Sequence, residues 1–568
     1  MELVDSRRLT GANILWSGPG AVLDVRVAPA ESAAGVTAWR REVRALLDAL
    51  GWTASTLYTR VFDGGASLAF DGPIDALYAA TEINECALER AVRSLGGEAN
   101  PPLAGEVARL GALVAEEVEP PRLALRAAAA EHGVAFMWDD DHVSVGLGTG
   151  SRTYATGALP APDAIDWDAV HDVPCALVTG TNGKTTTVRL LAAMASAAGH
   201  VPGFSSTDWV RVGDEVLDRG DWSGPGGARF VLRDRRTTIG LLETARGGML
   251  RRGLAVERAD VSAVLNVAAD HLGEWGVGSI EALADGKFVV TSVAPVAVLN
   301  ADDPLVAERG RALEAAGTHE IVWFTLTPET SALNGHLEHG GRAALVVDGE
   351  IVLARGADAT TLCRVDEVAV ALGGAARHNL ANALAAAAIA RELGIPDGAI
   401  AAALRSFGSH PDDNPGRLER FRVNGADVLL DFAHNPHGFA AILATARSMR
   451  PTRLAVLVGQ AGDRDDESIR GLARETWRAE PDRVFVKELA SYLRGREPGE
   501  IPGMIRDELL KCGAAAERIE DAGDELGAVR RALAWLEPGD VLVALVHGAR
   551  DAARDLVVEA AGAADPER

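Results

Sequence analysis

Hydrophobic and polar positions follow different patterns along the chain. In residues 1–157, alternating runs such as "AVLDVRVAP" are typical of half-buried strands, and "AWRREVRALLDALG" has its apolar positions at helical spacing. From about residue 173, short apolar runs alternate with helical stretches, which predicts parallel strands joined by helices. Similar apolar runs and helical stretches follow residue 412. The pattern therefore predicts a multi-domain α/β protein.

The same pattern predicts the boundaries between domains. Residues 158–172 are rich in Pro and Asp and have no sustained period, and a second break falls at "SHPDDNPG". A chain of 568 residues also exceeds what one hydrophobic core usually serves. We therefore expect an N-terminal α+β domain (1–157), a linker (158–172), a central P-loop ATPase domain with a parallel sheet (173–412) and a C-terminal Rossmann-like α/β domain (413–568).

Several buried strands and one hairpin can be expected from short apolar runs. The central candidates are "TTIGLLETA", "VSAVLNV" and "PVAVLN", and the C-terminal candidates are "VLLDFAH", "RLAVLVGQ" and "DVLVALVHG". The segment "RAALVVDGEIVLARG" predicts a hairpin that turns at Asp348-Gly349.

A glycine-framed loop follows the first of the parallel strands. In "LVTGTNGKTTT" the glycines allow a tight turn whose N–H groups can point at an anion, and the following helix adds a partial positive charge. A lysine and a threonine hydroxyl would reach phosphate and Mg²⁺. The loop has two residues between its glycines, not the usual four, so an ordinary strand-to-helix turn is the alternative. We expect these residues to bind nucleotide: Gly180, Thr181, Asn182, Gly183, Lys184, Thr185 and Thr186.

Polar side chains follow the next two predicted strands. Glu243 ends one strand, and Asp270-His271 follows the next. The carboxyl ends of parallel strands meet at one sheet edge, so these groups are candidate Mg²⁺ ligands there. The alternatives are a structural Glu and a helix-capping Asp beside a packed His. Lys287, on the following helix, has the pattern of a solvated surface lysine.

Two further groups are candidates for nucleotide contacts. His378, Asn379 and Asn382 stand at the head of an Ala-rich helix, where an Asn amide suits an adenine edge and helix capping is the alternative. In the C-terminal part, polar residues follow strands in "DFAHNPHG" (Asp431, His434, Asn435) and "VGQAGDRDD" (Gly462, Asp463, Arg464). These two motifs predict a second wall that closes over the nucleotide. Arg417, near the predicted hinge, either neutralises phosphate charge or is a surface arginine.

Composition excludes some classes of protein. Lys and Arg number 56 against 81 Asp and Glu, a net charge of −25, which argues against a nucleic-acid partner. The four cysteines form no CxxC motif, and "MELVDSRRLTGANILW" has no apolar core of a signal peptide. The apolar tracts are too short and Ala-rich for membrane spans. We therefore expect a cytoplasmic protein without a membrane partner, and a homo-oligomer is one open possibility.

The motifs together resemble the Mur ligase superfamily of ATP-dependent amide-forming ligases. "TGTNGKTTT", "HNLANALAA" and "DFAHNPHG" resemble its phosphate loop, adenine-side motif and C-terminal nucleotide motif. "ETARGGMLRRGL", "DHLG", "GDRDDESI" and "KELASYLRGREPGEI" are similar to the Mur-like module of the cyanophycin synthetase family, and "RRLTGANILW" is similar to the start of its N-terminal domain. That family carries an ATP-grasp module between these two parts, whereas here only a short linker lies between them.

The resemblance implies a role for each matching residue. Lys184 and Thr185 would hold the β/γ-phosphates and Mg²⁺, Glu243 and His271 would bind Mg²⁺, and Lys287 matches a lysine that many members carbamylate to make a magnesium-bridging carboxylate. Asn379 would contact adenine. The remaining nucleotide contacts would come from His378, Arg417, Asp431 and His434.

The resemblance also implies a reaction. It predicts an ATP-dependent carboxylate–amine ligase that uses ATP and Mg²⁺, passes through an acyl phosphate and joins an amino acid to an acidic peptide or small carboxylate. The N-terminal domain would hold the acceptor. Two alternatives remain open at this point: a catalytically silent nucleotide-binding scaffold, and a P-loop kinase.

Overall fold

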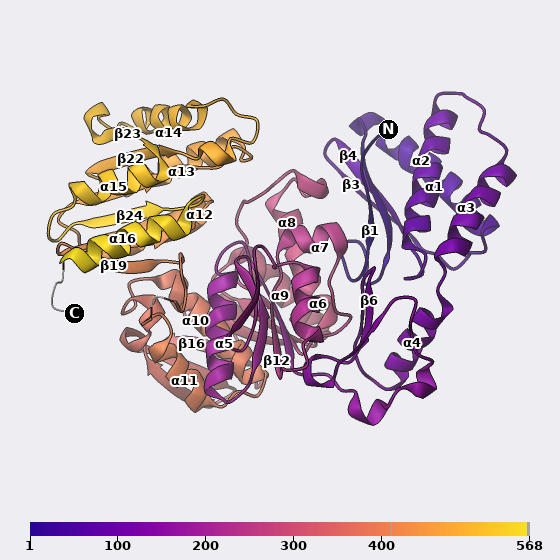
Figure 1. Cartoon of the computed structure of the whole chain (residues 1–568), viewed down its shortest axis with the longest axis horizontal. Helices are drawn as coiled ribbons and strands as arrows, with labels where there is room; N and C mark the ends of the chain where they lie inside the picture. Colours follow the sequence, from indigo (N-terminus) through magenta and orange to yellow (C-terminus); the bar gives the residue numbers. More distant parts are fainter. Residues whose placement is uncertain (411, 565–568) are drawn as a thin grey trace.

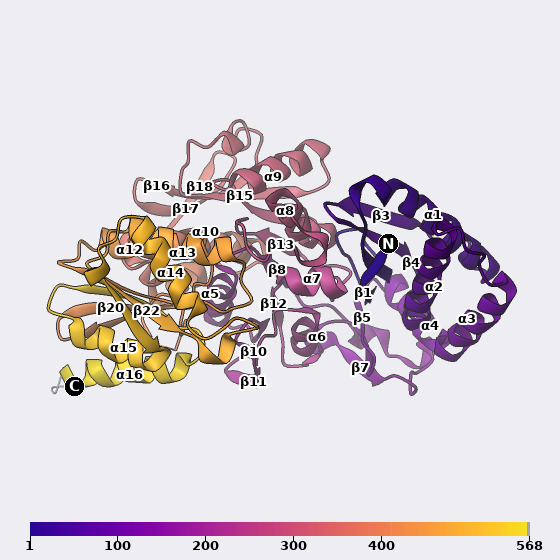
Figure 2. The same ribbon diagram turned by 90° about the horizontal axis from the view of Figure 1, so that it is seen from above.

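The computed structural model describes residues 1–410 and 412–564, and its parts lie in a row. The central domain sits between the N-terminal part on one side and the C-terminal domain on the other (Figure 1), and the view from above shows the same order (Figure 2). The prediction of a multi-domain α/β chain is confirmed.

The N-terminal part contains two antiparallel sheets. The larger, in the order β1-β2-β4-β3, packs against α1 and α2 around Trp39 and Phe70. The smaller, β5-β6-β7, packs against α4, and Ile165 and Val170 from the segment 158–172 are buried beside it. The elements are β1 (Glu2–Leu9), β2 (Gly20–Arg26), α1 (Pro29–Ala49), β3 (Leu57–Phe62), β4 (Gly65–Asp71), α2 (Leu77–Leu95), α3 (Leu103–Glu117), α4 (Pro120–Glu131), β5 (Phe136–Trp138), β6 (His142–Val145) and β7 (Arg152–Ala155).

The central domain is built on a sheet in the order β11-β10-β9-β12-β8-β13-β14-β15-β16-β17-β18. Neighbours from β9 to β16 are parallel, as the strand–helix alternation predicts, and antiparallel strands extend both edges. The strands are β8 (Cys175–Thr179), β9 (Pro202–Ser205), β10 (Trp209–Val212), β11 (Glu215–Arg219), β12 (Ile239–Glu243), β13 (Val261–Val264), β14 (Val296–Asn300), β15 (Glu320–Thr325), β16 (Arg342–Val347), β17 (Glu350–Arg355) and β18 (Asp358–Arg364). The predicted hairpin is present, with Asp348 and Gly349 at positive φ.

Helices cover both faces of the central sheet (Figure 1). One face packs against α5 (Lys184–Ala197), α10 (Arg377–Glu392) and α11 (Asp397–Ser406). The other packs against α6 (Pro225–Arg233), α7 (Arg246–Arg252), α8 (Ile280–Phe288) and α9 (Pro304–Ala316). Because parallel strands need crossover helices, this two-faced cover is what the alternating sequence dictates.

The C-terminal domain is a second, smaller α/β layer structure. Its sheet runs β19-β20-β24-β21-β22-β23, and only β19 is antiparallel to its neighbour. The strands are β19 (Glu419–Val423), β20 (Ala426–Asp431), β21 (Leu454–Val458), β22 (Arg483–Glu488), β23 (Ile519–Asp524) and β24 (Val541–Leu545). One face carries α12 (Pro436–Ser448), α13 (Asp466–Arg478) and α14 (Glu500–Lys511), and the other carries α15 (Glu525–Trp535) and α16 (Arg550–Ala564).

Backbone atoms join the N-terminal part to the central domain. The amide of Thr10 donates to the Arg252 carbonyl at 2.6 Å, and the amide of Leu254 donates to the Ala12 carbonyl at 2.8 Å. Glycines stand on both sides, because a Cβ at Gly11 would strike the Leu254 carbonyl and one at Gly253 would strike the Gly11 carbonyl. The join therefore depends on close approach of two main chains.

Within the described residues, no helix is both long and apolar enough to span a bilayer. The cysteines Cys86, Cys175, Cys363 and Cys512 are all free thiols.

Candidate active site

The glycine-framed loop joins β8 to the first turn of α5. β8 ends at Thr179 and α5 begins at Lys184, with Gly183 as N-cap at φ 87°. The Lys184 ammonium donates to the carbonyls of Gly180 and Thr181 at 3.1 and 3.2 Å, so it folds back over the loop. The loop thus has the strand, turn and helix N-terminus that phosphate binding requires.

Two constraints favour glycine at position 183: its backbone conformation and the close approach of α10. Its φ is in the left-handed region, and an added Cβ would strike the side-chain oxygen of Asn382 from α10. Gly199, just beyond the other end of α5, has φ 86° and open space around it.

These two glycines provide a matched test of the loop. We expect Gly199→Ala to lower the free energy of unfolding by about 1–2 kcal/mol, the cost of a left-handed alanine. Gly183→Ala should cost at least as much and also raise the KM for ATP roughly tenfold, because loop strain of about 1.4 kcal/mol is a factor of ten in binding. Thermal melts and ATP titrations check both. An unchanged KM for Gly183→Ala would contradict a nucleotide role for the loop.

Glu243 faces this loop from the end of the neighbouring strand. β12 pairs with β8, and the Glu243 carboxylate is 2% exposed. The Thr185 hydroxyl donates to its Oε2 at 2.8 Å, and the Thr207 hydroxyl and amide donate to Oε1 and Oε2 at 2.7 and 3.2 Å. Three donors therefore fix a carboxylate beside the first residues of α5.

A cavity of about 470 Å³ lies over the loop. Its walls come from both the central and the C-terminal domains: the glycine-framed loop lies on one side, and Arg417, Asp431 and His434 lie on the other. All but one of the residues expected from sequence to bind nucleotide line it: Thr181, Asn182, Gly183, Lys184, Thr185, Thr186, His378, Asn379, Arg417, Asp431 and His434. The exception, Gly180, lines the adjoining second cavity.

The candidate adenine-side residues are at the start of α10. Asn379 is 3% exposed and donates to the Val370 carbonyl at 3.0 Å, and it accepts a hydrogen bond from Asn382 at 3.2 Å. Ala376 is the N-cap, so helix capping does not explain the Asn. Burial, and then the nearby His437, lower the pKa of His378 to about 4, so its ring is neutral at neutral pH.

Asp431 and Arg417, two of the C-terminal candidates, differ in what they contact. Asp431 accepts hydrogen bonds from the amides of Leu418 and Ala433, both at 2.6 Å, and burial raises its pKa. Its carboxylate thus shapes the wall of the cavity by fixing backbone. Arg417 is 18% exposed and stands 3.5 Å from Asp208, so it is not a surface arginine.

A second cavity of about 700 Å³ adjoins the first. The two share the side chains of Thr181, Lys184, Thr207 and His434. The second cavity is rich in basic groups, which are Lys184, Arg246, Arg251, Arg252, His271, Lys287 and His434. Its acidic groups are Asp221, Asp270 and Glu274.

Lys287 is buried in the wall of the second cavity. It is 3% exposed and makes no salt bridge to any described residue, so the sequence-based expectation of a surface lysine is wrong. Burial, and then the charge of Lys184, lower its pKa well below the usual lysine value. Burial thus favours the neutral form of its amine. Only the family resemblance had singled it out.

His271 lies apart from the Thr185–Glu243 pair. Its ring is 37% exposed, and Nδ1 stands 3.3 Å from the Glu274 carboxylate. No hydrogen bond joins the ring to Thr185, Glu243 or Lys287 in the described part of the chain. Within residues 1–410 and 412–564, no three His, Cys, Asp or Glu side chains gather as a ready metal site. The four candidate metal ligands thus fall into two groups, one in each cavity.

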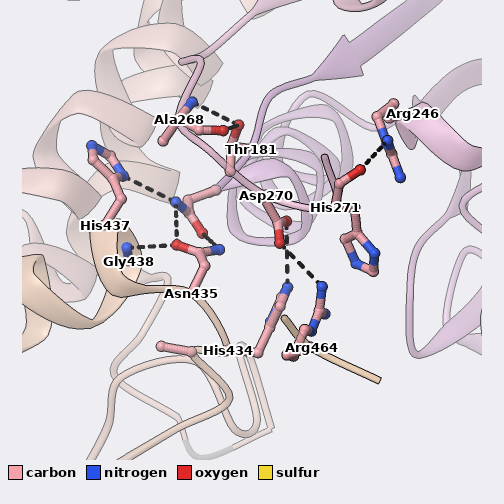
Figure 3. A network of polar contacts seen from close by, with 12 residues as sticks. Thr181, Arg246, Ala268, Asp270, His271, His434, Asn435, His437, Gly438 and Arg464 are labelled. Atoms are coloured by element: carbon pink, nitrogen blue, oxygen red, sulfur yellow. Dashed lines mark hydrogen bonds and ion pairs between the residues drawn. The ribbon is translucent and has the colours of Figure 1, made fainter. Parts of the chain in front are cut away.

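Polar contacts cross from the C-terminal domain to the loop (Figure 3). Asn182 and Asn435 exchange amide hydrogen bonds at 2.9 and 3.2 Å. Beside them Asp270 contacts Arg464 at 3.2 Å and His434 at 3.8 Å. Burial alone would raise the pKa of Asp270, but His434, His271 and Arg464 hold it well below its usual range. The C-terminal domain is therefore docked on the loop through both neutral and charged pairs.

Several site residues could not be expected from sequence. Thr207 orients Glu243, and Asp208 meets three arginines, yet the surrounding "SSTDWV" gives no motif. Arg464 was noticed as part of a strand-end motif, without its partner Asp270. The shared feature is that their partners belong to other elements of the fold.

The fold places a glycine-framed loop and two adjoining cavities between the central and C-terminal domains, and comparison with known families agrees with this arrangement. Profiles described as the Mur ligase middle domain and the Mur ligase glutamate ligase domain match residues 178–390 and 416–549, together more than half of the chain. The chain belongs to the Mur ligase family.

Similar proteins agree with this. A cyanophycin synthetase from Crocosphaera subtropica is 37% identical over 374 residues, which are 65% of this chain and 42% of that protein. The chain thus spans about two fifths of the length of such relatives. A UDP-N-acetylmuramoyl-L-alanyl-D-glutamate–2,6-diaminopimelate ligase from Corynebacterium glutamicum is 28% identical over 410 residues, covering 68% of this chain and 73% of the relative. Among solved structures, E. coli FolC in complex with DHPP and ADP matches the fold with a TM-score of 0.50 at 17% identity, over 68% of this chain and 89% of FolC.

Proposed function

We propose that the chain joins the carboxylate of an acidic peptide or small acid to the amine of an amino acid, with an acyl phosphate as intermediate and ADP and phosphate as products. The observation that carries this is the pair of adjoining cavities. One is lined by the glycine-framed loop, the other is basic, and Lys184 and His434 line both. A phosphoryl group held at Lys184 would therefore face a carboxylate in the second cavity.

The reaction needs an activated carboxylate, because oxide is a poor leaving group. A carboxylate oxygen attacks the γ-phosphorus of ATP, the bond to the β-phosphate oxygen breaks, and ADP leaves. A neutral amine then attacks the carbonyl carbon, the C–O bond to phosphate breaks, and the amine proton is lost. Both steps gather negative charge, which Lys184, the α5 N-terminus and Arg246 would stabilise. Docking of the C-terminal domain would exclude water from the acyl phosphate.

Magnesium fits the Thr185–Glu243 pair. A hydroxyl and a carboxylate 2.8 Å apart offer the oxygen ligands that Mg²⁺ takes beside phosphate, and Glu243 is already held in place by Thr207. We propose that these two residues hold the ion, with His271 and Lys287 as further ligands on the side of the second cavity. The ion would supply charge neutralisation on the transferring phosphoryl group.

The basic second cavity supports an anionic acceptor. Arg246 is paired with Glu274, whereas Arg251 and Arg252 have no carboxylate partner among the described residues. They lie at the end of α7, beside the backbone join to the N-terminal part. We propose that they hold a second carboxylate of the acceptor, which the N-terminal part helps to position. Arginine, as suggested by the cyanophycin synthetase relatives, is the first donor to test.

We expect one amide bond for each acceptor carboxylate and no extension of a polymer backbone. The glycine-framed loop at residues 180–186 is the sole phosphate cradle evident in the sequence, and two different ligations would need two ATP sites. The test is to incubate protein, ATP, Mg²⁺, aspartate, arginine and a short aspartate primer, and then to weigh the products by mass spectrometry.

Single additions of one amine would agree with this expectation. A product ladder spaced by aspartate plus arginine would refute it. Amine-dependent release of ADP would also separate a ligase from a silent scaffold, and a phosphorylated hydroxyl product would indicate a kinase instead.

A further inference from the structure

Asp208 is a buried carboxylate surrounded by arginines. Its side chain is 7% exposed and accepts hydrogen bonds from Arg189 and Arg550, both at 2.6 Å, while Arg417 stands at 3.5 Å. Burial alone would raise the pKa of Asp208, but Arg417, Arg189 and Arg550 hold it at about 2. One negative charge therefore draws in three positive ones.

The three arginines come from three different parts of the molecule. Arg189 is on α5, the helix that begins at the glycine-framed loop, and Arg417 stands between the central and C-terminal domains. Arg550 begins α16 of the C-terminal domain and lies 342 residues beyond Asp208 in the chain. Arg417 and Arg550 also pack over the same ring of Phe432, at 5.0 and 4.5 Å from its centroid. Asp208 thus contacts the helix that follows the glycine-framed loop, the segment between the two domains, and the C-terminal domain.

Thr207, the residue before Asp208, connects this arginine cluster to Glu243, the candidate magnesium ligand. Thr207 holds both oxygens of Glu243, through its hydroxyl at 2.7 Å and its amide at 3.2 Å. Since Thr207 and Asp208 share a peptide bond, a shift of Asp208 moves the donors that orient Glu243. Packed polar networks of this kind can carry coupling between two sites.

We infer that Asp208 is a positioning residue that latches the C-terminal domain in its docked state through Arg550 and, through Thr207, sets the orientation of Glu243. This rests on the proposed ligase reaction and deepens it, because it makes activation of the carboxylate depend on domain docking. The acyl phosphate would then form only when the C-terminal domain shields it. Such dependence is the usual benefit of domain closure in enzymes with reactive intermediates.

Helix α16 offers a matched pair of variants. Arg550→Ala removes a charged contact between the domains, whereas Arg554→Ala removes an ion pair with Glu419, also at 2.6 Å, within the C-terminal domain and a longer one of 3.6 Å to Asp412 at the hinge. The two arginines are similarly exposed, at 33% and 24%. Arg550→Lys keeps the charge and serves as the conservative replacement.

The experiment measures three quantities for each variant. These are ADP release with amine, ADP release without amine, and the radius of gyration by X-ray scattering with ADP bound. For Arg550→Ala we expect kcat to fall about tenfold, within ordinary coupling energies, and the share of ADP released without amide formation to rise. Its scattering should show a more open molecule. Arg550→Lys should recover part of each loss, and Arg554→Ala should match the wild type.

The outcomes separate the latch from the ligase assignment. If wild-type protein releases no ADP with any amine, the proposed function fails, while the scattering comparison still tests the latch. If wild-type protein ligates and Arg550→Ala equals Arg554→Ala in coupling and in shape, the latch is wrong. Asp208→Asn gives a further check, because Arg550→Ala should then add little to it. Full additivity of the two losses would overturn the inference.

Discussion

Lys184→Ala should abolish most nucleotide chemistry. The lysine heads α5, lines both cavities and is the cation nearest the loop carbonyls that it contacts at 3.1 and 3.2 Å. Alanine removes a preorganised charge from the place where negative charge gathers on the β- and γ-phosphates. Losing one such stabiliser costs about 100- to 1,000-fold in kcat, so we expect ADP formation to fall by roughly that factor.

The control for this variant is Lys511→Ala, which removes a lysine that is 68% exposed at the end of α14. That change should leave ADP formation near the wild-type rate. Equal thermal melts of the two variants would exclude unfolding as the cause. Near-normal ligation by Lys184→Ala would contradict the assignment of the loop.

Lys287→Ala should have a loss of comparable size, for a different chemical reason. Burial lowers the pKa of this amine and so favours its neutral form, which can attack CO₂ to form a carbamate with loss of one proton. We expect the carbamate, an anion among Lys184, Arg246 and His271, to serve as a magnesium ligand. An uncharged alanine should lower activity about 100-fold or more, the scale of losing one charge stabiliser. Added short carboxylic acids should restore part of it, because they can occupy the space of the carbamate.

Lys487 provides the matched control for the rescue. It is also fully buried, but its ammonium contacts the Glu525 carboxylate and the Leu545 carbonyl, both at 2.5 Å. Carboxylic acids should therefore not restore Lys487→Met. Mass spectrometry of the wild type should show one added CO₂ on Lys287, retained after trapping of the carbamate. Full activity of Lys287→Ala without any rescue would show that no carbamate is needed.

Local features could be predicted from the sequence. The glycine-framed loop, the central strands and the turn at Asp348-Gly349 depend on residues that are neighbours in the chain, so period and turn chemistry were sufficient. The position of Glu243 beside the loop also followed, because β8 and β12 are parallel and end at the same edge.

Features made by distant segments could not be predicted. The burial of Lys287 depends on how α8 packs against the wall of the second cavity, and its own helix shows an ordinary lysine at its end. The role of Asp208 depends on ion pairs with arginines of α5 and α16, which come together only in the folded protein. Asp431 was expected at the nucleotide, and the structure shows its carboxylate bonded to two backbone amides in the wall. For such residues the type of side chain can indicate the region of the site. Their contact partners become visible only once the packed helices and the docked domains are known.

The close main-chain contact at Gly11 and Gly253, beside α7, affects how an enzyme of this kind can change its acceptor. Main-chain hydrogen bonds between Thr10 and Arg252 and between Ala12 and Leu254 hold the N-terminal part beside α7, so this part of its attachment does not depend on side-chain identity. A substitution at Arg251 can then alter the charge offered to the acceptor while these main-chain hydrogen bonds remain. Acceptor specificity can therefore evolve through side chains of the second cavity without loss of these main-chain contacts between the two parts of the protein.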